Sequence, residues 1–260
     1  MIGIFSSGLG GLTVAKAVEQ YLPQYPLLYL GDTARSPYGT KGIEAAVDYA
    51  LENALFLCSQ GAKIIVISDN YPSAIAADRL RLELPVPVID AIGPTVRQAI
   101  AASATGRIGV IGSRATMESD VYRTEILRKK SACTIFPAAC PLLLPLIEEG
   151  WIDKRETKMI LRRYLYPLRN QQIDTLILGC SHYSLLRHLI QSRIGKKVTL
   201  IDSSLAVVDS LQTFLTAHAT IPRQEDHTHS ENRYFVTSLT ESTKDFAAQI
   251  FHRPLDLETL

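Results

Sequence analysis

The sequence lacks the features of several protein classes. No apolar run approaches the roughly 18 residues that a helix needs to cross a bilayer, and the start has neither the basic flank nor the long apolar segment of a signal peptide. The formal net charge is only +1, which gives no long-range field to attract nucleic acid or an anionic membrane. We therefore expect a cytoplasmic protein that binds neither nucleic acid nor a membrane.

Cysteine is scarce as well. The chain has four cysteines and no CxxC pair: Cys58, Cys133, Cys140 and Cys180. This pattern indicates neither a zinc ribbon nor a disulfide framework. Asp226, His227 and His229 are of metal-ligating types, but three such residues in a polar segment are a weak signal. We expect neither a metal nor a cofactor.

Short apolar runs alternate with amphipathic stretches along most of the chain. This alternation predicts an α/β fold with mostly parallel sheets and helices on both faces. The expected helices include 42–59, 155–169 and 203–217, where apolar residues recur at helical spacing. The expected strands are Ile2–Phe5, Leu27–Leu30, Lys63–Ile67, Val86–Ile89, Arg107–Ile111, Thr134–Phe136, Thr175–Leu178, Val198–Ile201 and Tyr234–Val236.

Two pairs of segments resemble each other. IIVISDNY at 64–71 is followed 111 residues later by TLILGCSH, and IGIFSSGLGG from residue 2 is followed 106 residues later by IGVIGSRATM. The offsets are consistent with a duplicated unit, although Ile/Val-rich strands also resemble one another by chance. We predict two α/β domains, residues 1–95 with 206–260 and residues 96–205. The strand after the polar segment RQEDHTHSEN is then expected to return to the first half.

The two segments of the first repeat end in residues of different chemical types. Asp69 and Asn70 follow one apolar run, whereas Cys180, Ser181 and His182 follow the other. The carboxyl ends of buried parallel strands open onto a crevice, which makes these residues site candidates. The alternatives are structural, because Asp69 is also a plausible helix N-cap and Cys180 a plausible buried cysteine.

Three further segments are candidates for the functional site, and each of them also has a purely structural interpretation. The turn after the first strand contains Ser6, Ser7 and Gly8, but Thr13 replaces the third glycine of a dinucleotide fingerprint. Such a turn either presents backbone N–H groups to a substrate carboxylate or only allows close packing. Residues 32–39 form a loop over the same crevice or an ordinary exposed connection, and Glu148 by default ends a solvated helix.

Together these segments resemble the glutamate racemase family, within the wider aspartate/glutamate racemase superfamily. The resemblance runs from Ile2 to about Leu211 and rests on SGLGGLTVAK, YLGDTARSPYGTK, SDNYPSA in part, IGVIGSRAT, CPLLLPLIEEG, YLYPL, DTLILGCSHY and IDSS. It implies two pseudo-symmetric α/β domains with a cofactor-independent site between them. It also implies two cysteines that exchange protons with opposite faces of the substrate α-carbon, supplying D-glutamate for peptidoglycan. Dimers are common in such families, so a homodimer is a further expectation.

The resemblance assigns roles to particular residues. Cys180 matches the second catalytic cysteine, and His182 and Glu148 match the groups that assist it. Substrate contacts are implied for seven positions: Ser7, Pro37, Tyr38, Gly39, Asn70, Ser181 and His182. The expected substrate is a small amino acid or carboxylic acid.

The other half of the site departs from the family pattern. Asp69 stands where the first catalytic cysteine is expected, Ser6 where its assisting aspartate is expected, and Tyr71 where a threonine is expected to help hold the substrate. A carboxylate is the weaker base, since intrinsic pKa values of about 3.9 and about 8.5 separate it from a thiolate by about 6 kcal/mol. Burial can raise a carboxyl pKa by up to about 3–5 units, and Ser6 removes a negative charge beside Asp69.

Three hypotheses follow. In the first, Asp69 and Cys180 form an asymmetric acid/base pair in a cofactor-independent amino-acid racemase. In the second, Cys180 alone transfers a proton in a decarboxylase or isomerase of the same superfamily. In the third, the protein is a catalytically impaired paralogue that only binds an amino-acid-like anion.

Overall fold

Two separate parallel sheets form the framework of this computed structural model, which describes residues 1–218 and 232–260. The first sheet has the order β10-β9-β2-β1-β3-β4 and contains β1 (Ile2–Ser6), β2 (Leu27–Gly31), β3 (Ile64–Ile67), β4 (Val88–Ile89), β9 (Arg233–Val236) and β10 (Leu257–Thr259). The second has the order β6-β5-β7-β8 and contains β5 (Arg107–Gly112), β6 (Thr134–Ala139), β7 (Thr175–Gly179) and β8 (Thr199–Asp202). Every described strand pair is parallel.

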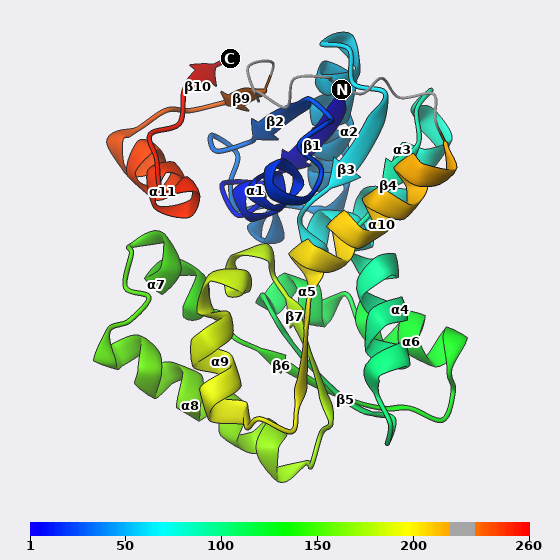
Figure 1. Cartoon of the computed structure of the whole chain (residues 1–260), viewed down its shortest axis with the longest axis vertical. Helices are drawn as coiled ribbons and strands as arrows, with labels where there is room; N and C mark the ends of the chain where they lie inside the picture. Colours follow the sequence, from blue (N-terminus) through cyan, green and yellow to red (C-terminus); the bar gives the residue numbers. More distant parts are fainter. Residues whose placement is uncertain (219–231) are drawn as a thin grey trace.

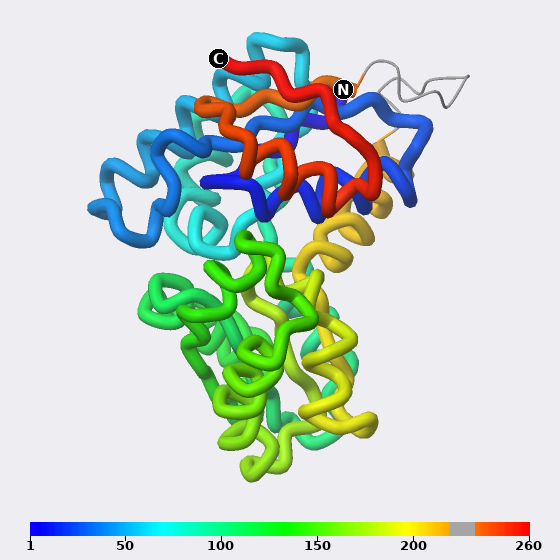
Figure 2. Tube along the Cα trace, turned by 90° about the vertical axis from the view of Figure 1, so that its left-hand side faces the viewer, coloured from blue at the N-terminus to red at the C-terminus, as the bar shows by residue number. Residues whose placement is uncertain are grey.

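Helices cover both faces of each sheet. Those that follow strands of the first sheet are α1 (Leu12–Tyr21), α2 (Ile43–Ser59), α3 (Asn70–Glu83) and α11 (Glu241–Phe251), with a short 3₁₀ turn η1 (Tyr38–Thr40). Those of the second half are α4 (Ile92–Ala102), α5 (Arg114–Glu118), α6 (Val121–Lys129), α7 (Leu143–Glu148), α8 (Arg155–Asn170), the 3₁₀ helix η2 (Ser181–Leu186) and α9 (Arg187–Ile194). Figures 1 and 2 show the resulting two lobes, one above the other. The predicted α/β fold is therefore confirmed.

The predicted elements agree closely with the observed ones, and two differences have physical reasons. The helices expected at 42–59, 155–169 and 203–217 are α2, α8 and α10 (Ser203–Ala217). Strand β6 continues through Pro137, which is tolerated because β6 lies at the edge of its sheet. Strand β10 was not predicted, because its three residues LET form no apolar run and none of them is fully buried.

The C-terminal segment returns to the first sheet, as predicted. Strand β9 pairs with β2, and β10 adds to β9 at the sheet edge. Asp226, His227 and His229 lie outside the described residues. In the described part of the chain, every helix is too short or too polar to cross a membrane.

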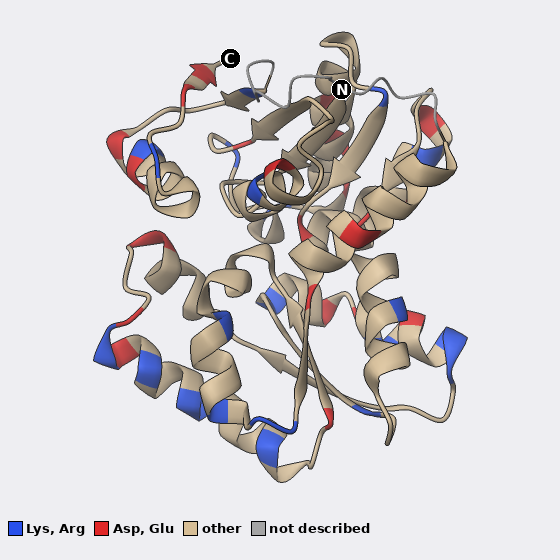
Figure 3. Ribbon diagram, in the orientation of Figure 1, with Lys and Arg blue, Asp and Glu red and all other residues tan. Residues whose placement is uncertain are grey.

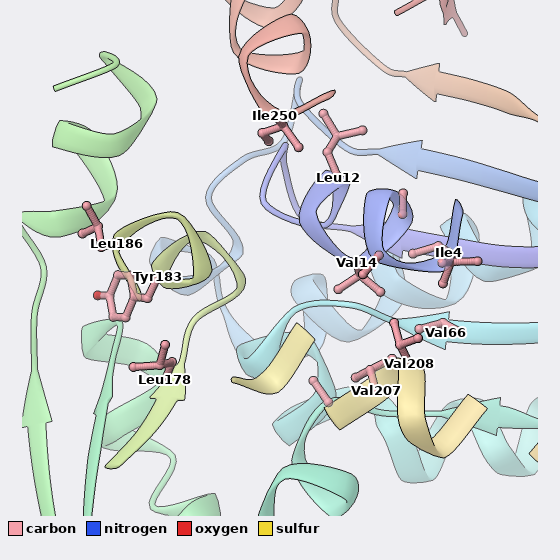
Figure 4. Packing of buried hydrophobic residues seen from close by; sticks show 14 of the residues in the cluster. Ile4, Leu12, Val14, Val66, Leu178, Tyr183, Leu186, Val207, Val208 and Ile250 are labelled. Carbon is pink, nitrogen blue, oxygen red and sulfur yellow. The ribbon is translucent and has the colours of Figure 1, made fainter. Parts of the chain in front are cut away.

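One hydrophobic core continues from the first half into the second. It includes side chains of β1, α1, β7, η2 and α10, among them Ile4, Val14, Leu178, Tyr183 and Val207 (Figure 4). Helix α10 contacts α1 in one half and α4, β7 and β8 in the other (Figure 1). Because strands of both sheets pack against this shared core, their carboxyl ends are held close together. Domain boundaries near residues 95 and 206 remain our proposal.

A buried hydrogen bond also joins the two halves. The Tyr122 hydroxyl, from α6, donates to Oδ1 of Asn70 at the start of α3, and the Asn70 amide nitrogen lies 3.2 Å from Ser203 Oγ. Tyr122 and Asn70 are both almost completely buried. The amide of Asn70 is therefore held at both ends by groups outside its own helix.

We predict that Tyr122→Phe lowers the free energy of unfolding by about 1–3 kcal/mol, because it leaves the buried Asn70 oxygen without its donor. Urea denaturation measures the change. Tyr166→Phe is the control: Tyr166 is 61% exposed, so its loss of a hydroxyl is expected to alter stability by less than about 0.5 kcal/mol. Equal effects of the two substitutions would contradict the structural role of the hydrogen bond.

Candidate active site

A cavity of about 320 Å³ lies at the carboxyl ends of strands from both sheets. The first half lines it with the segments after β1, β2 and β3, and the second half with those after β5, β6 and β7. Parallel α/β sheets bind their ligands at this end of the strands. The volume is at the lower limit for small-molecule sites, which suits a ligand the size of an amino acid.

Eleven of the residues singled out from the sequence line this one cavity. They are Ser7, Pro37, Tyr38, Gly39, Asp69, Asn70, Tyr71, Glu148, Cys180, Ser181 and His182. Ser6 does not line it. As the last residue of β1, Ser6 is fully buried, and its hydroxyl lies 2.9 Å from that of Tyr29. A direct substrate contact of Ser6 is therefore not supported by its position.

Asp69 occupies the N-cap position of α3, yet its side chain makes no hydrogen bond to that helix. Its Oδ2 accepts hydrogen bonds from the backbone N–H and the hydroxyl of Ser7, each 2.6 Å away. Its Oδ1 accepts one from the Ser181 hydroxyl at 3.1 Å. The carboxylate thus connects the tips of β1 and β3 to the tip of β7, across the boundary between the halves.

Cys180, His182 and Glu148 form a chain of polar contacts on the opposite side. Sγ of half-buried Cys180 lies 3.8 Å from His182 Nδ1. His182 Nε2 lies 3.4 Å from Glu148 Oε1, close enough for an ion pair but outside hydrogen-bond geometry. The imidazole therefore lies between a sulfur and a carboxylate.

This environment determines the charge of His182. Burial disfavours the imidazolium, but the neighbouring Cys180 and Glu148 outweigh burial and raise the pKa of His182 from 6.5 to about 10. His182 is thus protonated at neutral pH. An imidazolium beside the sulfur stabilises a thiolate at Cys180.

The glycine-rich turn after β1 fixes the position of His182 by close packing. A Cβ atom on Gly10 would lie 2.3 Å from His182 Cε1 and 2.5 Å from Ser181 Oγ, so a larger residue does not fit. The Phe246 ring, from α11, lies 5.8 Å from the imidazole ring, centroid to centroid. Both contacts come from the half opposite to His182.

Two lining residues have their polar groups engaged elsewhere. The Tyr38 hydroxyl donates to buried Asp32, whose carboxylate also accepts from Arg35 Nε at 2.7 Å. Asn70 is held by Tyr122 and Ser203, as described above. The Asp32 carboxylate therefore connects Tyr38 and Arg35 within the 32–39 loop, and this loop forms one wall of the cavity.

The segment 113–118 was not assigned to the site from the sequence. It follows β5 and contributes Ser113, Arg114, Thr116 and Glu118 to the lining. The repeat of IGIFSSGLGG as IGVIGSRATM could have identified this segment as part of the site. In that repeat Ser113 stands 106 residues after Ser7 and occupies the matching strand end. Within the described residues, no group of three or more His, Cys, Asp or Glu side chains is arranged to hold a metal ion.

Comparisons with known proteins agree with this geometry. A family model described as Asp/Glu/hydantoin racemase matches residues 11–211. A glutamate racemase of Syntrophus aciditrophicus is 41% identical over 92% of this chain and 87% of its own length, and one of Desulforudis audaxviator is 39% identical over 97% and 94%.

Solved structures are similar over the whole chain. Glutamate racemase RacE1 of Bacillus anthracis superposes with a TM-score of 0.93 at 31% identity, covering 100% of this chain and 97% of that one. The glutamate racemase of Francisella tularensis, solved in complex with D-glutamate, gives a TM-score of 0.89 at 32% identity, covering 100% and 96%.

We predict that NMR titration of the His182 ring protons gives a pKa near 10 and that both Cys180→Ser and Glu148→Gln lower it. Because this pKa exceeds the unfolded value of 6.5, the protonated ring stabilises the fold fully below about pH 6.5. That stabilisation is lost as the pH rises through about 10.

The matched control for this titration is Glu149→Gln, which removes the neighbouring exposed acid outside the cavity lining and leaves the titration of His182 unchanged. Titration of His182 near 6.5 in the unmodified protein would refute this assignment.

Proposed function

The chain belongs to the Asp/Glu/hydantoin racemase family, and on that basis we propose that it is a cofactor-independent racemase or epimerase of a small amino acid. One observation carries the proposal. Asp69 and Cys180, at the tips of β3 and β7, line the same cavity from opposite halves. Two acid/base groups on opposite sides of an α-carbon are what inversion by proton transfer requires.

Cys180 is the proposed base of the second half. The thiolate takes the α-proton, which leaves a planar carbanion conjugated with the substrate carboxyl group and a neutral thiol. His182 stabilises the thiolate as a cation 3.8 Å away, and Glu148 keeps that cation in place. The burial of His182 strengthens both electrostatic interactions.

Asp69 is the proposed acid/base group of the first half. In its protonated form it delivers a proton to the opposite face of the carbanion and becomes a carboxylate. Three donor groups, from Ser7 and Ser181, then stabilise that carboxylate. In the reverse direction the carboxylate removes the proton from the other enantiomer, and Cys180 returns one.

A second candidate is favoured by the same hydrogen bonds. Three hydrogen bonds hold the Asp69 carboxylate in place, and in this second candidate Cys180 is the group that transfers the proton. The site then catalyses a one-sided reaction such as decarboxylation or isomerisation of a small acid. The two candidates differ in stereochemical outcome.

We further propose a ligand class, a pathway, a cellular location and an oligomeric state for the protein. A related glutamate racemase was solved with D-glutamate, which supports an amino acid as ligand. A D-amino acid product would connect the protein to peptidoglycan synthesis, the role that its resemblance to the glutamate racemase family implies. We also propose a cytoplasmic homodimer that acts without metal or cofactor.

We predict that the protein, incubated with a panel of L-amino acids in deuterated buffer, converts at least one into its D-enantiomer with deuterium at the α-carbon. Chiral chromatography with mass spectrometry measures both events. Cys180→Ser is expected to lower the rate by at least about 100-fold, because it removes an acid/base group. Tyr166→Phe, on the exposed face of α8, serves as the unaffected control.

The outcomes separate the candidates. Deuterium uptake without inversion, or release of CO₂, would favour the one-sided reaction. Ligand binding with no α-proton exchange, no release of CO₂ and no isomerisation of any substrate would contradict both catalytic candidates.

A further inference from the structure

Several donor groups between the two halves already have an acceptor within the protein. Ser7 gives its N–H and hydroxyl to Asp69, and Ser181 gives its hydroxyl to the same carboxylate. The Asn70 amide is held by Tyr122 and Ser203. A carboxylate of the ligand therefore finds the position beside Ser7 and Ser181 filled by the Asp69 carboxylate.

The charges of the cavity lining also disfavour an additional carboxylate on the ligand. Three carboxylates, Asp69, Glu118 and Glu148, face the cavity. Among the described lining residues, Arg114 is the one lysine or arginine, and it is exposed. Protonated His182 lies between Glu148 and Cys180, so its positive charge already has a carboxylate partner.

The basic residues of the chain gather elsewhere. Helix α8 carries several lysine and arginine residues, coloured blue along its ribbon in Figure 3, and none of them lines the cavity. These residues are Arg155, Lys158, Arg162, Arg163 and Arg169. They therefore add no positive charge to the lining itself.

Tyr71 adds a neutral polar group beside the acidic lining. Its half-buried ring lines the cavity, and burial together with the nearby Glu118 raises the pKa of its hydroxyl. The phenol therefore stays protonated as a donor at neutral pH. A neutral amide side chain of a ligand could accept from Tyr71 and donate to Glu118.

From these observations we propose that the cavity selects an amino acid with an uncharged side chain over one with an acidic side chain, and that Asp69 is the residue that determines this specificity. A second carboxylate on the ligand would meet like charge and occupied donors, which costs binding free energy. An uncharged amide of the same shape avoids both costs. The inference rests on the proposed function, because it takes an amino acid as the ligand.

Glutamine and glutamate form the matched pair of ligands, since they differ by one amide in place of one carboxylate. We predict that calorimetric titration at pH 7 gives at least about tenfold tighter binding of glutamine than of glutamate. Asp69→Asn removes the charge and keeps the shape, and it is expected to reduce this preference at least about tenfold. Glu118→Gln, at an exposed lining position, is expected to reduce it by a smaller factor.

Glu149→Gln is the control variant, because it removes an exposed carboxylate outside the lining and is expected to leave the preference unchanged. Glu118→Gln keeps the test decisive if Asp69→Asn does not fold. Equal or tighter binding of glutamate by the unmodified protein would overturn the inference, and so would binding of neither ligand. Preferential binding of glutamine without α-proton exchange would instead refute the proposed racemisation and leave the inference standing.

Discussion

The hydrogen bonds that converge on the Asp69 carboxylate are the constraint on which the site depends. Oδ2 accepts two bonds from Ser7 and Oδ1 accepts one from Ser181, so a single side chain connects the strand tips of both halves. These bonds fix where the negative charge lies and occupy the donors around it.

The rest of the fold holds these strand tips together. A core shared between the halves, with α10 packed against both, places the ends of β3 and β7 at one cavity. The two sides then differ in chemistry. Cys180 is backed by a cationic His182 and by Glu148, whereas Asp69 is backed by neutral hydroxyl and amide donors. The site is symmetric in its scaffold and asymmetric in its charges.

The sequence predicts the scaffold well, because buried parallel strands appear as short apolar runs. It also identifies both strand tips and eleven residues of the cavity lining, since a repeat and a family resemblance point to the same positions. It does not reveal where the Asp69 carboxylate points, because an N-cap and a site group have the same local sequence. Nor does it show that the buried Ser6 hydroxyl contacts the Tyr29 hydroxyl or that Tyr122 donates a hydrogen bond to Asn70. Both contacts join residues that are far apart in the chain.

We propose that the fixed carboxylate of Asp69 takes the place of a thiol-based proton-transfer group in the first half of the site. The most direct measurement compares α-proton exchange of glutamate in deuterated buffer between the unmodified protein and the triple variant Asp69→Cys, Ser6→Asp, Tyr71→Thr. We expect exchange at least about tenfold faster in the variant, because a thiolate is the stronger base. Exchange at an equal or slower rate in the folded variant would contradict it.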